Sequence, residues 1–138
     1  MRAFLNVFLA CALFLTAACS SAEQLAAAER EVERFHKAFD EGQFGEIYDK
    51  AADAFRKGAT RQEFIAFMET VQRKLGKVEE AKRGNSNLNY SAGGTLVSLA
   101  YATTFANGKG TEQFGFAVSG KKAVLVGYNL NSKDLLLR

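Results

Sequence analysis

The chain has 138 residues, of which 48% are hydrophobic and 24% are charged, with 18 Lys and Arg against 15 Asp and Glu. This length fits one domain after removal of a leader segment. Because the basic and acidic residues are interleaved along the chain, the sequence lacks the basic stripe of a nucleic-acid-binding protein. We therefore expect no nucleic-acid partner.

Residues 1–18 are typical of a bacterial lipoprotein signal peptide. Met1–Arg2 is a short basic start, residues 3–15 form an apolar run that is too short to span a bilayer, and small residues lead to Cys19. The pattern resembles a lipobox, in which the cysteine is acylated and becomes the mature N-terminus. We expect a leader at 1–18, a single domain at 19–138, and a membrane contact through the lipid on Cys19.

Two residues bear on the location of the protein. Ser20 follows the cysteine in place of the aspartate that retains some lipoproteins in the inner membrane. We therefore expect an outer-membrane anchor with the domain facing the periplasm. Thr16 stands where a lipobox usually has a large aliphatic residue. The alternative is ordinary cleavage nearby, for instance after Ala22, which releases a soluble secreted protein.

Apolar residues spaced three and four apart predict helices in the first half of the domain. The segment 21–39 begins with a capping box in its first four residues. A shorter helix follows Gly42, and a third helix starts at the capping box Thr60–Glu63 and ends at Gly76. The apolar residues of the last two helices are Phe44, Ile47, Tyr48, Ala51 and Phe55, then Phe64, Phe67, Met68, Val71 and Leu75.

Strict alternation then predicts a three-stranded antiparallel meander from Gly93 to Asn131. The preceding segment 77–90 is charged and weakly alternating, as in an edge strand. One face of the meander is bulky and apolar, and the other, the small face, is not. The bulky face has Val97, Leu99, Tyr101, Thr103, Phe105, Phe114, Phe116, Val118, Val124, Val126, Tyr128 and Leu130, and the small face has Ser98, Ala100, Ala102, Thr104, Gly115, Ala117, Ser119, Ala123, Leu125, Gly127 and Asn129.

The small face is almost free of charge, because the charged residues of the meander lie at or near its turns. Glu112, for example, is interpreted as a residue near a turn. An uncharged sheet face can accept another flat surface closely. We therefore interpret it as a candidate interface for a homodimer or an envelope protein partner, and a tolerated neutral surface is the simpler alternative. The candidate interface residues are Ala100, Ala102, Ala117 and Leu125.

Helices that precede strands predict an α+β fold, with N-terminal helices packed on an antiparallel sheet. The segments 35–44, 60–78, 101–108, 112–114 and 125–130 resemble the domain of unknown function 4019 family of small exported bacterial proteins. The resemblance covers nearly the whole mature chain. It implies a nuclear-transport-factor-two-like cone, which is a curved sheet wrapped around helices in a cystatin-like arrangement, often with a pocket at the open end.

The family supplies no catalytic residues, and it often has an aromatic residue where this chain has Ala123. A pocket in the cone implies an apolar or amphipathic small molecule, and core packing is the alternative role for the aromatic residues. The candidate pocket residues are Phe39, Tyr48, Tyr101, Phe105, Phe116 and Tyr128.

We expect a non-catalytic binding or interaction module that needs no metal and no cofactor. His36 is the only histidine, which is too few for the usual zinc site, and we interpret it as a half-exposed helix residue. Some cone-fold relatives are enzymes that use a pocket aspartate. The first alternative is therefore an isomerase- or dehydratase-like enzyme, and the second is a structural subunit of an envelope assembly. The enzyme would pair Tyr48, Tyr101 or Tyr128 with Asp40 or Asp49.

Overall fold

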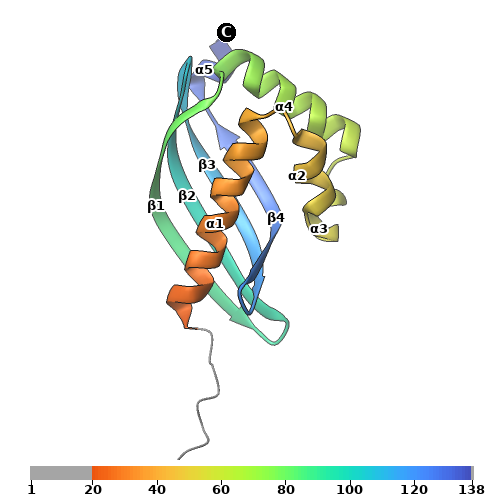
Figure 1. Cartoon of the computed structure of the whole chain (residues 1–138), viewed down its shortest axis with the longest axis vertical. Coiled ribbons are helices and arrows are strands. Elements are labelled where there is room, and N and C mark those ends of the chain that lie inside the picture. Colours follow the sequence, from red (N-terminus) through yellow and green to blue (C-terminus); the bar gives the residue numbers. More distant parts are fainter. Residues whose placement is uncertain (1–19, 138) are drawn as a thin grey trace, which may run out of the picture.

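A computed structural model describes residues 20–137 (Figure 1). The leader prediction for residues 1–18 and the acylation of Cys19 lie outside the described residues. No helix within the described part of the chain is long and apolar enough to cross a bilayer. The elements in order are α1 (Ser21–Asp40), α2 (Phe44–Lys50), α3 (Asp53–Arg56), α4 (Arg61–Leu75), β1 (Val78–Ser91), β2 (Gly94–Phe105), β3 (Gly108–Ser119), β4 (Lys122–Asn131) and α5 (Lys133–Leu137).

The helix ends follow local chemistry. At α4 the predicted capping box is confirmed, since the Thr60 hydroxyl accepts from the backbone N–H of Glu63 and the Glu63 carboxylate accepts from that of Thr60. The N-cap of α1 is Ser20, one residue earlier than expected. The second predicted helix is broken into α2 and α3, because the backbone N–H of Ala52 donates to Leu125 O on β4 at 2.9 Å and leaves the helical pattern.

The sheet is an antiparallel meander in the order β1-β2-β3-β4, and the α+β prediction is confirmed. The predicted edge segment forms β1, a strand of 14 residues. We call the side of the sheet that carries α1 the inner face and the opposite side the outer face; α1 lies along the length of the inner face (Figure 1). The alternation predicted for β2 and β3 is confirmed, since Val97, Leu99 and Phe114 are buried while Ala102 and Ala117 are exposed.

The face assignment of the first half of β4 is wrong, and a β-bulge is the reason. Phe116 pairs with Leu125 while Gly115 pairs with Gly127, so Val126 is an extra residue on β4. Ala123 and Leu125 therefore point inward, and both are only 8% exposed. Val124 and Val126 take the outward positions that the prediction gave to Ala123 and Leu125. Tyr128 remains in inward phase with its partner Phe114.

The core lies between the inner face and the helices. It contains the predicted aromatic residues with one exception, Phe67, which is 41% exposed. The buried side of α4 runs through Phe64, Met68, Val71 and Leu75. Phe67 immediately precedes Met68 and points away from this buried side of the helix. The prediction that Phe67 packs in the core is therefore wrong.

Candidate functional site

A buried carboxylate lies at the centre of the inner face. The Glu112 side chain on β3 is 1% exposed. Its Oε2 accepts from the Thr103 hydroxyl at 2.6 Å and lies 2.7 Å from Nε2 of His36, and its Oε1 accepts from the Tyr128 hydroxyl at 2.7 Å. These four residues, the Glu112 cluster, join α1, β2, β3 and β4 at one point.

The sequence reasoning missed Glu112 because it treated the charge as part of a turn. The signal that identifies it is spacing: Glu112, Phe114 and Phe116 are two residues apart, and so all three point inward. Two members of the cluster were singled out separately, His36 as a half-exposed helix residue and Tyr128 as a candidate pocket residue, and neither was paired with Glu112. His36 packs against the centre of the sheet. Its side chain is 12% exposed, and its ring packs edge-on against Phe114 and Tyr101.

The tyrosines in and beside the Glu112 cluster have raised pKa values. Burial and the Glu112 carboxylate raise the pKa of Tyr128 well above its usual range. Burial raises the pKa of Tyr101 to about 12. Both phenols stay protonated at neutral pH, and Tyr128 uses its proton to hydrogen-bond Glu112. A buried carboxylate needs several donors to offset the loss of water, and three side chains supply them here.

A lateral cleft of about 270 Å³ opens between α1, α2 and β4. Its floor is apolar and its rim is charged. Small side chains line it on two elements, Ala38 on α1 and Ala123 on β4, and none of the four residues of the Glu112 cluster lines it. The floor is formed by Phe35, Ala38, Ile47, Ala51, Phe116, Ala123, Val124 and Leu125, and the rim by Glu31, Arg34, Lys37, Glu41, Gln43, Glu46 and Lys50.

Comparison with known proteins places the chain in a family. The model of the family described as "Protein of unknown function (DUF4019)" matches residues 31–128. The chain belongs to the DUF4019 family. The cone-fold relationship implied by the resemblance stays a prediction.

One solved structure similar to this DUF4019 protein is Bd1075 of Bdellovibrio bacteriovorus, with a TM-score of 0.50 and 11% sequence identity. The match covers 78% of this chain and 40% of Bd1075, so this chain spans less than half the length of that protein. At this identity the likeness concerns the fold alone. No curated protein matches the sequence.

The candidate pocket residues do not share one cavity. Phe39, Tyr48, Tyr101 and Phe105 are buried in the core of the DUF4019 protein, and Tyr128 belongs to the Glu112 cluster. Only Phe116 lines the lateral cleft. The Tyr48 hydroxyl donates to the backbone oxygens of Arg56 and Ala59 at 3.1 and 2.9 Å. These hydrogen bonds join α2 to the end of α3 and to the loop that leads into α4.

The two aspartates of the enzyme alternative are engaged elsewhere. Asp40 accepts from the backbone N–H of Val78 at 2.9 Å. Asp49 receives two hydrogen bonds from the Arg61 guanidinium, at 2.9 and 3.0 Å, and this contact lowers the pKa of Asp49. No group of three or more His, Cys, Asp or Glu side chains within residues 20–137 is arranged to hold a metal ion.

The candidate interface is only partly on the outer face. Ala102 and Ala117 are exposed there and Ala100 is half-buried, but Leu125 points inward at the bulge. Its place is taken by an apolar row across three strands, in which Leu96 pairs with Ala117 and Ala117 pairs with Val124. Leu96 is 42% exposed. The outer face is therefore more apolar than the sequence indicated.

The geometry of the Glu112 cluster predicts a strong effect on stability. Glu112→Ala leaves three buried donors without their acceptor, and we expect it to lower the free energy of unfolding by about 3–5 kcal/mol. Tyr128→Phe removes one hydrogen bond to a charged group and should cost about 1.5–3 kcal/mol. Urea denaturation followed by circular dichroism measures both.

Gln113→Ala is the matched control, since Gln113 is the next residue of β3 and is exposed on the outer face. We expect a change within about 0.5 kcal/mol. If Glu112→Ala is as mild as this control, the cluster does not hold the fold together.

Proposed function

We propose that this DUF4019 protein is a lipoprotein of the bacterial envelope that works by binding and not by catalysis. In this proposal the acylated Cys19 holds it at the outer membrane, with the domain in the periplasm. The sequence of the leader supports the anchor, and α1 begins at Ser21, only two residues after that cysteine. The domain is thereby kept close to the bilayer surface.

The observation that carries the binding role is the lateral cleft. Its volume of about 270 Å³ is just below that of clefts that hold drug-sized ligands. The apolar floor suits one short aliphatic chain or ring. At the rim, Arg34 pairs with Glu31 and Lys50 pairs with Glu46.

Two further rim residues, Lys37 and Glu41, are exposed and form no ion pair among the described residues. One is positive and the other negative, so together they suit a head group that carries both signs of charge. We infer an amphipathic small molecule with an apolar segment and a zwitterionic or polar head.

The state of the acid–base groups supports binding over the enzyme alternative. The hydroxyls of Tyr48 and Tyr128 donate hydrogen bonds to acceptors inside the fold, and the Asp49 carboxylate accepts hydrogen bonds from the Arg61 guanidinium. General acid–base chemistry needs such a group within hydrogen-bond reach of a bound substrate. Among these residues, none lines the cleft.

The anchor is tested by replacing one cysteine at a time in a bacterial host. We expect the wild-type protein in the membrane fraction, with a mass that includes acyl groups on Cys19. Cys19→Ala should lose this mass and move to the soluble fraction, whereas the control Cys11→Ala should change neither. A wild-type protein that is soluble and starts at Glu23 contradicts the anchor and supports the secreted alternative.

The cleft is tested with dodecylphosphocholine, a single-chain zwitterionic amphiphile, below its micelle-forming concentration. Binding is measured by titration calorimetry and by NMR shifts of methyl groups on the cleft floor. Ala123→Leu fills the floor and should weaken binding about tenfold or more, which corresponds to about 1.4 kcal/mol. Ala117→Leu is the same substitution on the outer face and should leave binding unchanged. Equal affinities for the two variants, or no binding to the wild type, contradict the cleft as the site.

A second candidate function is self-association through the outer face, and the apolar row of Leu96, Ala117 and Val124 favours it. In Figure 1 the helices cover the inner face, and the other side of the sheet is bare. Two copies placed face to face would bury no unpaired charge at this row, which removes the largest cost of association. We infer a second copy of the chain as the occupant.

Sedimentation equilibrium tests this second candidate. The wild type should dimerise at high concentration, and Ala117→Lys should shift it to the monomer by placing a charge in the centre of the row. Ala66→Lys introduces the same charge at an exposed position of α4 and should leave the dimer intact. A wild type that is monomeric at every concentration contradicts self-association.

A further inference from the structure

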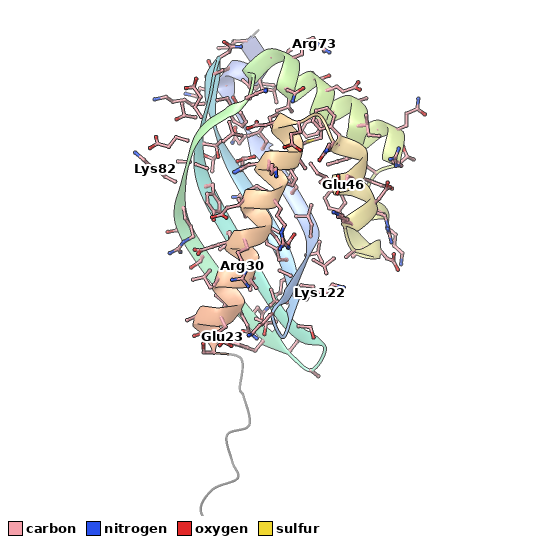
Figure 2. The ribbon with its side chains drawn as sticks, in the orientation of Figure 1. Glu23, Arg30, Glu46, Arg73, Lys82 and Lys122 are labelled. Atoms are coloured by element: carbon pink, nitrogen blue, oxygen red, sulfur yellow. The ribbon has the colours of Figure 1, made fainter. Side chains whose placement is uncertain are left out.

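Cations from three separate segments gather at the end of the molecule opposite the start of α1. In Figure 1 the end of α4, the turn between β2 and β3, and α5 all lie at the upper end of the long axis, and α1 begins at the lower end. Figure 2 shows Arg73 at the upper end and Glu23 at the lower end. We call the upper surface the basic end. Its cations are Arg73, Lys74, Lys77, Lys109 and Lys133.

Hydrogen bonds tie the three segments together. The backbone N–H of Ala106 donates to Lys77 O at 2.9 Å, and that of Asn107 donates to Leu75 O at 2.8 Å, so the β2–β3 turn is fixed to the end of α4. The Lys109 N–H donates to an Asp134 carboxylate oxygen at 2.9 Å, which fixes the same turn to α5. The charges are therefore held side by side by the fold, although they are up to 60 residues apart in sequence.

The side chains of these cations are not neutralised by carboxylates of the described residues. None of the five forms an ion pair within residues 20–137, although Lys74 Nζ donates to the backbone oxygen of Leu135 at 3.0 Å. Of the nearby acids, Asp40 and Asp134 accept backbone N–H groups, whereas Glu79 and Glu69, which lies one turn before Arg73 on α4, are exposed. Of the eleven other Lys and Arg residues within residues 20–137, six are paired with acids, namely Arg34, Lys50, Arg56, Arg61, Lys82 and Arg83. The other five are spread over α1, the end of α3 and the β3–β4 turn, namely Arg30, Lys37, Lys57, Lys121 and Lys122.

Two apolar side chains stand beside the charges. Leu136 and Leu137 are each 82% exposed, although Leu135 in the same helix is partly buried against the core. Both follow Lys133 within the five residues of α5. Exposed leucines next to lysines are typical of segments that lie at a membrane surface, where the lysines meet headgroups and the leucines enter the acyl boundary.

We propose that the basic end binds the surface of an anionic phospholipid bilayer. The lysine side chains act as flexible point charges, which suits a layer of mobile headgroups better than one rigid phosphate site. Leu136 and Leu137 then leave water on contact with the bilayer. This binding does not depend on the anchor at Cys19, because α1, which begins two residues after that cysteine in the sequence, starts at the end of the domain opposite the basic end. With both in place, one molecule connects two bilayers.

The test uses residues 20–138, which include every described helix, strand and core residue, after a cooperative thermal transition has shown that this chain is folded. Flotation measures its partition onto vesicles of phosphatidylcholine alone and onto vesicles in which about a third of the lipid is phosphatidylglycerol. We expect binding to the anionic vesicles only. Lys109→Glu with Lys133→Glu should lower the partition coefficient by about thirtyfold or more, since each lysine contributes about fivefold.

Two further variants make the result specific. Leu136→Ser with Leu137→Ser should also weaken binding, because it keeps every charge and removes the apolar contact. Lys121→Glu with Lys122→Glu applies the same change of charge at the exposed turn between β3 and β4, and should leave binding within about twofold of wild type. Absence of binding to anionic vesicles overturns the proposal, and an acidic protein surface then becomes the occupant to consider. Equal losses in the two lysine pairs also overturn it, since net charge alone would explain them.

Discussion

The Glu112 carboxylate is the constraint on which the arrangement of this domain depends. It is buried, and a buried charge is stable only when enough donors surround it. Its donors come from α1, β2 and β4, so the helix and three strands must meet in one register. The inner face is therefore closed at its centre by a satisfied polar cluster, with Phe114 packed beside it. Binding surfaces are left to the periphery: the lateral cleft, the outer face and the basic end.

The features that the sequence predicts well have short-range causes. The capping box at Thr60, the order of helices and strands, and the alternation along β2 depend on residues a few positions apart. The features that it misses depend on partners far away in sequence. Glu112 needs donors from three other elements, and the break between α2 and α3 needs Leu125 of β4. The basic end likewise forms only when α4, the β2–β3 turn and α5 come together.

The three peripheral surfaces lie on different sides of the DUF4019 domain and can be tested one at a time. The lateral cleft faces sideways between α1 and β4, the outer face lies behind the sheet, and the basic end caps the long axis. A ligand in the cleft and a second copy on the outer face would therefore meet only at Val124 of β4, which lines the cleft and also belongs to the apolar row. An anchor next to the start of α1 would leave all three accessible.

The extra residue in β4 also affects how related sequences should be aligned. Without Val126, the strand from Ala123 to Leu130 would alternate regularly and keep the same side chains inward. A relative that lacks this residue would thus differ from this chain by a deletion inside a strand. An alignment that forbids gaps in strands would match inward positions of one protein to outward positions of the other on one side of the bulge. Substitution patterns there would then look more permissive than the core is, unless the gap is placed at the bulge.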